Sequence, residues 1–202
     1  MKLYYTPGAC SLSPHIILRE AGLQFDLEKV DLVSGKTEGG ADFKSVNPNG
    51  YIPALVLENG ETLTEGPAIV QYLADKAPET RLAPAAGTLE RTRVQEFLNF
   101  TGTELHKSFS PLFKDDSTDI EKDKARTKVA ARFDHVESLF SDGRAYVTGD
   151  TFTVADSYLF VMTAWAEHTG IGLATWPNVA AFAGRVKSRP AVQAALQAEG
   201  LI

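Results

Sequence analysis

Apolar and polar positions at the start of the chain follow a pattern typical of short strands and helices in alternation. Residues 2–6 predict a strand, residues 12–21 predict a helix, and residues 25–31 predict a second strand with apolar side chains at alternate positions. Gly22 stands directly after the helix, where left-handed backbone commonly ends one. The chain therefore begins with two parallel strands joined by a helix.

Turn residues divide the next stretch into further short elements. Asn59-Gly60 is the pair that two-residue hairpins favour. We expect a short helix through Phe43 and Val46, a turn at 47–50, a strand at 54–57, a return strand at 62–63 and a helix at 65–76. The order β-α-β-α-β-β-α fits a thioredoxin-like domain, in which Pro53 is a candidate for a cis peptide bond.

Strand patterns are absent from the second half of the chain, which predicts an all-helical domain. Asp156 follows Thr153 at the spacing of a capping box, which marks the start of a helix. Other helices are expected at 88–113, 119–140, 179–187 and 190–198. The predicted fold is α/β plus all-α, with a thioredoxin-like domain at 1–78, a linker at 79–87 and an all-α domain at 88–202.

Composition narrows the classes of function. The 202 residues carry a formal net charge of −6, which argues against a nucleic-acid-binding surface. No apolar run approaches the roughly 20 residues that span a bilayer, and the start of the chain lacks the apolar region of a secretory signal. One cysteine forms no internal disulfide and no Cys-x-x-Cys pair. We expect a cytoplasmic protein that binds neither membrane nor nucleic acid.

The single cysteine, Cys10, stands in the loop between the first strand and the first helix. Pro7 and Gly8 mark the loop, Ser11 offers a capping hydroxyl, and Pro14 suits a first helical turn. Free backbone N–H groups at a helix start favour a thiolate over a thiol. This setting predicts sulfur chemistry at Cys10, whereas the alternative is a small buried apolar side chain.

Polar side chains gather on one side of the predicted helix at 88–113. At about 100° per residue, Asn99, Thr103 and His106 share one face, and Glu104 and Lys107 flank it. Such a face is either simply solvated or part of a binding site, and the second interpretation requires that it lie near the Cys10 loop.

Several motifs together resemble bacterial glutathione transferases of the beta class, over nearly the whole chain. The motifs are Pro7-Gly8-Ala9-Cys10-Ser11-Leu12, Asn47-Pro48-Asn49-Gly50-Tyr51-Ile52-Pro53-Ala54-Leu55, Leu63-Thr64-Glu65-Gly66-Pro67-Ala68-Ile69, Glu104-Leu105-His106-Lys107 and Phe152-Thr153-Val154-Ala155-Asp156. Cys10 followed by Ser11, together with His106, is the part most specific to the beta class.

The resemblance implies a glutathione site in the thioredoxin-like domain. The peptide backbone of glutathione would pair with Ile52, beside a cis Pro53, as an added strand does. Its γ-glutamyl end would meet the Glu65 carboxylate and the helix start at Gly66. The resemblance also implies a homodimer and contacts to glutathione, some across the dimer interface, from Asn99, Thr103, Glu104, His106 and Lys107.

The chain departs from the family at one position of this site. The family commonly has a lysine where this chain has Gly35, facing the glycine carboxylate of glutathione. Lys36 is the neighbouring cation, and we expect its long, flexible side chain to take over that contact.

The chemistry implied is attack of the glutathione thiolate on a hydrophobic electrophile, without a metal, as in detoxification. Helix-end N–H groups, the Ser11 hydroxyl and His106 would favour the thiolate, and Cys10 is the third candidate catalytic residue. Cys10 would also form a mixed disulfide with glutathione, which permits thiol–disulfide exchange or dehalogenation. The candidate walls of the electrophile pocket, which are alternatively core residues, are Phe109, Phe113, Tyr158 and Trp165. The competing functions are a non-catalytic carrier of hydrophobic ligands and a dimeric interaction module.

Overall fold

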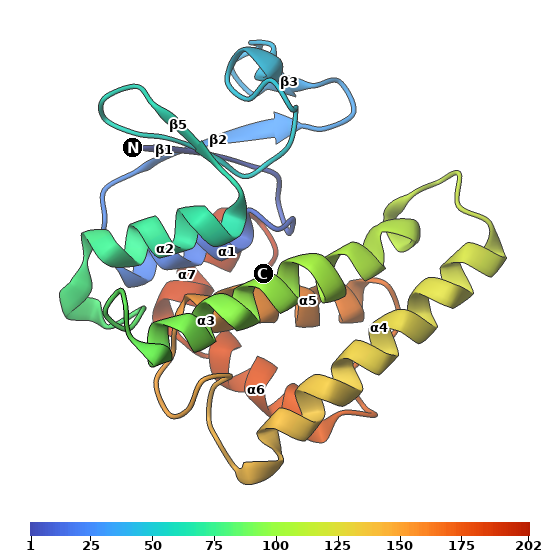
Figure 1. Ribbon diagram of the computed structural model, residues 1–202. Helices are drawn as coiled ribbons and strands as arrows, with labels where there is room; N and C mark the ends of the chain where they lie inside the picture. The colour runs from blue at the N-terminus through green and yellow to red at the C-terminus, as the bar shows by residue number, and fades with distance from the viewer. The chain divides into compact units, whose positions relative to one another are not determined.

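The computed structural model describes residues 1–202 and divides into two compact units (Figure 1). Unit 1 comprises Met1–Ala83 and Ser188–Ile202, and unit 2 comprises Pro84–Lys187. None of the helices combines the length and the apolar character needed to cross a bilayer.

Unit 1 is built on a five-stranded sheet with the order β3-β2-β1-β4-β5. The strands are β1 (Lys2–Tyr5), β2 (Asp26–Asp31), β3 (Lys36–Thr37), β4 (Ala54–Val56) and β5 (Thr62–Thr64). β1 and β2 are parallel, and every other pairing is antiparallel. This arrangement confirms the predicted strand–helix–strand unit followed by a hairpin, while β3 is an edge strand that the sequence pattern did not predict.

Helices pack on both faces of the sheet because β1 alternates its side chains. Leu3 and Tyr5 are buried, whereas Tyr4 packs on the other side against a cluster that contains Phe43. The helices of unit 1 are α1 (Leu12–Glu20), η1 (Phe43–Ser45), α2 (Gly66–Lys76), η2 (Pro78–Thr80) and α7 (Pro190–Ala198). Figure 1 shows α1, α2 and α7 together along one face of the sheet. The cis peptide bond predicted at Ile52-Pro53 is present.

The compact units divide the chain differently from the expected domains. Residues 188–202, expected in the helical domain, belong to unit 1, where α7 packs on α1. Arg189 forms an ion pair with Glu20, and Glu199 contacts His15, so both ends of α7 are tied to α1. The expected linker at 79–87 is itself divided between the units, since the boundary lies at Ala83.

Unit 2 is helical, as predicted. Its elements are α3 (Leu89–Phe100), the π turn η3 (Thr101–Leu105), the 3-10 helix η4 (His106–Phe113), α4 (Asp119–Leu139), η5 (Phe140–Asp142), α5 (Val154–His168) and α6 (Pro177–Lys187). The expectation of one regular helix over 88–113 is wrong, because regular α-helix ends at Phe100. Gly102 is a poor helix former, and Pro111 supplies no N–H.

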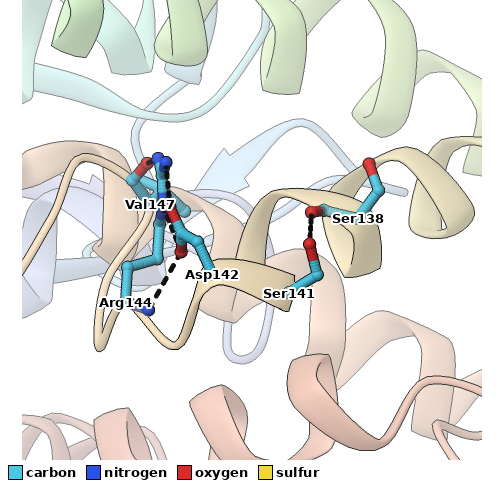
Figure 2. Close-up of polar contacts among 5 residues, drawn as sticks. All are labelled: Ser138, Ser141, Asp142, Arg144 and Val147. Carbon is cyan, nitrogen blue, oxygen red and sulfur yellow. Dashed lines mark hydrogen bonds and ion pairs between the residues drawn. The ribbon is translucent and has the colours of Figure 1, made fainter.

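Hydrogen bonds from side chains hold the segment between α4 and α5 in place, as Figure 2 shows. The Ser141 hydroxyl donates to the Ser138 carbonyl, and the Arg144 guanidinium bonds both the Asp142 carboxylate and the Val147 carbonyl. Arg144 lowers the pKa of Asp142 to about 2 by donating to its carboxylate. These contacts present the Val147 N–H to the start of α5.

Asp156 at the start of α5 receives that N–H group. Its carboxylate accepts from the backbone of Val147 at 2.8 Å, and from the backbone and hydroxyl of Thr153 at 2.7 and 3.0 Å. Asp156 is fully buried, which raises its pKa to about 6 against the opposing effect of these donors. The capping arrangement predicted for Thr153 and Asp156 is confirmed.

Candidate functional site

Three segments of unit 1 meet at one end of the sheet. Tyr4 in β1 faces Ala54 in β4, and Ala54 faces Thr64 in β5. Because both pairings are antiparallel, the loop after β1, the segment before β4 and the segment after β5 all lie at the same end of the strands. The sheet therefore brings together the Cys10 loop, Ile52-Pro53 and Glu65-Gly66, three motifs far apart in sequence.

Cys10 lies half-buried at this end of the sheet. Its thiol donates to the Ile52 carbonyl, with the sulfur 3.6 Å from the oxygen. The predicted free amides of α1 are partly used, since Leu12 N–H donates to Ala9 and Ser13 N–H to the Cys10 carbonyl. The Ser11 N–H, directly after the cysteine, donates to no acceptor within the protein. One helix-end amide is thus available beside the sulfur.

The Ser11 hydroxyl is engaged within the loop rather than directed at the cysteine. It accepts from the Thr6 N–H at 3.2 Å, lies 3.3 Å from the Thr6 carbonyl, and is completely buried. The hydroxyl joins the start of α1 to the end of β1. Its structural effect is to hold the loop on which Cys10 lies.

Asn47, which the sequence marked only as a turn residue, fixes the segment that presents Ile52. Its side-chain amide donates to the Tyr51 carbonyl at 2.6 Å, and its side-chain oxygen accepts from the Asn49 N–H at 3.2 Å. The Asn47 side chain is buried, and both bonds are partly buried. An asparagine followed by Pro-Asn-Gly was the signal available, but it indicated a turn and not the role of its side chain.

Glu65 has an unusual backbone at the start of α2. Its φ is +65°, a value that residues other than glycine seldom adopt, and its side chain is exposed. A Cβ on Gly66 would lie 3.7 Å from Cγ of Pro53, an ordinary contact, so the protein itself leaves room there. Gly66, the first residue of α2, therefore lies beside the cis proline. Its N–H is the amide left over at this helix start, because Pro67 has none and the N–H groups of Ala68 and Ile69 donate to the Glu65 carbonyl.

Lys36 lies elsewhere on the sheet. It belongs to the edge strand β3, where it pairs with Asp31 and is exposed. β2 and β1 lie between β3 and β4, the strand that follows Ile52.

In unit 2, the predicted aromatic residues form one cluster with His106. Nδ1 of His106 lies 2.6 Å from the Tyr158 hydroxyl, and its ring centroid lies 4.8 Å from that of Trp165. Phe113 packs against Trp165 at the same centroid distance, and Phe109 packs at 5.7 Å. Phe109 is fully buried and Phe113 is 45% exposed, so the first is a core residue and the second reaches the surface.

The polar face expected on α3 does not continue to His106. Asn99 and Thr103 are exposed and bonded to each other through the Thr103 hydroxyl. The π turn after Phe100 changes the angular spacing, and the His106 ring packs in the aromatic cluster. Lys107 is exposed, whereas the Glu104 carboxylate forms an ion pair with Arg132 at 2.7 Å. The common face assumed a regular α-helix, and regular α-helix ends at Phe100.

Burial in the aromatic cluster, together with a smaller effect of the Lys107 charge, lowers the pKa of His106 to about 4. The imidazole is therefore neutral at pH 7. In the unfolded chain, His106 takes up a proton near the ordinary pKa of about 6.5. The contribution of neutral His106 to the free energy of unfolding is therefore fully present above that pH and is lost as the pH falls towards 4.

We expect the His106→Asn substitution to remove this part of the acid sensitivity. The free energy of unfolding should then fall by about 2 kcal/mol less between about pH 7 and 4.5 than it does in the native chain. Urea denaturation at the two pH values measures the difference. Equal losses in the two proteins would contradict the assigned burial.

Comparisons with known proteins agree with this geometry. The family model for the N-terminal domain of glutathione S-transferases matches residues 8–76, and the model for the C-terminal domain matches residues 100–190. The glutathione S-transferase GstA of Escherichia coli O157:H7 is 44% identical over 201 residues, which is 100% of both chains.

Solved structures give the same result. The bacterial beta class glutathione S-transferase of Sphingomonas chungbukensis is 51% identical with a TM-score of 0.97, covering 100% of both chains. A sphingomonad glutathione S-transferase complexed with glutathione is 50% identical with a TM-score of 0.96, again covering 100% of both chains. The resemblance found in the motifs is confirmed, and the chain belongs to the glutathione S-transferase family of enzymes, among its bacterial beta-class members.

Proposed function

We propose that unit 1 binds glutathione and that the protein transfers its thiolate to a hydrophobic electrophile. The observation that carries the proposal is the convergence of Cys10, the cis Ile52-Pro53 bond and Glu65 at one end of the sheet. A similar protein has been solved with glutathione bound, which supports the same ligand here. An interaction module has no need of all three features.

The proposed binding mode uses backbone groups first. The cysteinyl residue of glutathione pairs with Ile52 as an added strand, and Asn47 keeps that segment in place. The γ-glutamyl end lies at α2, where the Glu65 carboxylate takes the ammonium and the Gly66 N–H, at the positive end of the helix dipole, takes the α-carboxylate. Gly66 keeps this position free of a side chain.

In unit 2, we propose that the aromatic cluster supplies the surface for the electrophile. Phe113 is the most exposed of its phenylalanines, and Trp165 lies against it. The contacts to glutathione from unit 2 remain predictions, of which Glu104 requires that its ion pair with Arg132 be shared or broken. These predicted contact residues are Asn99, Thr103, Glu104, His106 and Lys107.

The proposed reaction is a displacement at carbon. The glutathione sulfur forms a bond to the electrophilic carbon, and the leaving group departs with the electron pair of the broken bond. The Ser11 N–H and the start of α1 favour the anionic sulfur, and Ser11 contributes through the loop that its hydroxyl holds. We further propose that the protein acts as a cytoplasmic homodimer in detoxification.

Turnover of a chloronitrobenzene acceptor with glutathione tests the proposal. We expect chloride release and a thioether product that depend on both the protein and glutathione. Retention on immobilised glutathione without turnover would indicate a non-catalytic carrier. Absence of both retention and turnover would leave an interaction module as the function.

A further inference from the structure

Contacts with two aromatic side chains fix the ring of His106 in unit 2. Trp165 and Tyr158 meet this ring edge to face, at interplanar angles of 84° and 80° and centroid distances of 4.8 and 5.9 Å. The Tyr158 hydroxyl also lies 2.6 Å from Nδ1 of His106. Tyr158 belongs to α5 and is 6% exposed, so its hydroxyl comes from a buried residue of a regular helix. The imidazole therefore has one defined orientation, with Nδ1 turned to Tyr158.

The distance between the Tyr158 oxygen and Nδ1 indicates which of the two groups donates. Bonds from an N–H donor to oxygen are usually about 2.7 Å or longer, whereas hydroxyl donors reach about 2.5 Å. The chemistry agrees, because a phenol is a stronger acid than a neutral imidazole N–H, and the imidazole lone pair is a stronger base than a phenol oxygen. Both arguments favour donation from the Tyr158 O–H to Nδ1.

Nε2, the other ring nitrogen of His106, has no hydrogen-bond partner within the protein. This nitrogen is also accessible, because the buried side-chain atoms without a partner are Thr101 Oγ1 and Arg132 Nε. The ring as a whole is half-buried, at the side of Trp165. Nε2 is thus the one atom of the imidazole that is free to bind a ligand.

We propose that Tyr158 is a positioning residue whose hydroxyl donates to Nδ1 of His106 and so keeps the ring proton on Nε2, as a hydrogen-bond donor to the anionic sulfur. The inference rests on the reaction proposed above. The opposite tautomer would present a lone pair to the sulfur and would repel it. A donor that is already oriented costs no reorganisation when the thiol ionises. The low pKa of His106 agrees with a donor that carries no charge of its own.

Long-range ¹H–¹⁵N correlation NMR of the full-length protein reads the tautomer, because it distinguishes a protonated ring nitrogen from one with a lone pair. We expect the native chain at neutral pH to carry the His106 proton on Nε2. The His106→Asn variant identifies the signals of this ring among the four histidines. Tyr158→Phe should give a mixture of the two tautomers. Tyr146→Phe, at a residue whose ring packs on Phe152, is the matched control and should leave the tautomer unchanged.

Turnover of the chloronitrobenzene acceptor shows whether this tautomer matters for the reaction. Tyr158→Phe should lower kcat about fivefold with little change in the KM for glutathione, as expected when one orienting hydrogen bond is lost. In the His106→Asn background the same substitution should cause no further loss, because Tyr158 acts through His106. Tyr146→Phe should leave kcat unchanged.

The outcomes separate this inference from the proposed function. A ring proton on Nδ1 in the native chain, or an unchanged tautomer in Tyr158→Phe, would overturn the inference without use of any substrate. Equal losses of kcat from Tyr158→Phe in the native and His106→Asn backgrounds would also overturn it, since Tyr158 would then act only as a wall of the electrophile pocket. Absence of turnover in the native chain, with the proton on Nε2, would refute the proposed function and with it the use of this donor in catalysis.

Discussion

Replacing Cys10 with alanine is expected to abolish formation of a glutathionyl adduct while conjugation at carbon continues. The chain has one cysteine, so no other residue can form a mixed disulfide. With oxidised glutathione, the Cys10 thiolate attacks one sulfur, forms the protein–glutathione disulfide and releases one glutathione thiolate. A second glutathione then attacks the mixed disulfide and regenerates oxidised glutathione and the Cys10 thiolate. Conjugation uses the sulfur of glutathione and does not require this cycle.

Mass spectrometry after incubation with oxidised glutathione measures the adduct, and the chloronitrobenzene assay measures conjugation. The native chain should show one adduct and the Cys10→Ala variant none. Cys10→Ser is the control that keeps a hydrogen-bond donor opposite the Ile52 carbonyl. Loss of conjugation in both variants would show that Cys10 itself, and not glutathione, attacks the carbon electrophile.

The Glu199→Ala substitution is expected to destabilise unit 1 by about 3–5 kcal/mol. The Glu199 carboxylate accepts from the Gly8 N–H at 2.8 Å and lies 2.7 Å from Nδ1 of His15, and both side chains are fully buried. Arg19, which has only donors, gives its Nε–H to Nε2 of His15. His15 is therefore neutral and donates its Nδ1–H to Glu199. Removing the carboxylate takes this acceptor away from the buried His15 Nδ1–H and from the part-buried Gly8 N–H.

Urea denaturation of three variants measures this effect. Glu199→Gln keeps an acceptor oxygen and should cost less than Glu199→Ala. Glu20→Ala removes the other α1–α7 contact, the more exposed ion pair with Arg189, and should cost about 1 kcal/mol or less. Costs that are equal for Glu199→Ala and Glu20→Ala would contradict the assigned burial of the Glu199 network.

Local signals in the sequence account for most of the fold. Gly22 has a φ of +64° after the C-cap Ala21 of α1, and Gly60 has a φ of +85° in the turn that joins β4 to β5, as the freedom of glycine predicts. The π turn at Thr101–Leu105 was not predictable from periodicity, because a helix with one altered turn has the same apolar spacing on either side. His106 follows this turn and packs in the aromatic cluster, whereas Asn99 and Thr103 are exposed.

The candidate site was predictable where a motif itself supplies the chemistry, as at Cys10, Pro53 and Glu65. The residues that hold these motifs were not, because they act over long separations. Glu199 and His15 are 184 positions apart, and neither has a local pattern that indicates a partner. The packing of α7 in unit 1 involves the same long-range contacts, so the local sequence pattern did not predict it either.

The most direct test of the account is the ionisation of the glutathione thiol in its complex with the Cys10→Ala variant, in which glutathione carries the only sulfhydryl. Ultraviolet absorbance of the thiolate, followed against pH, gives the pKa of the bound thiol. The account predicts a value at least about one unit below that of glutathione in free solution. Saturating binding with the same pKa as free glutathione would contradict it.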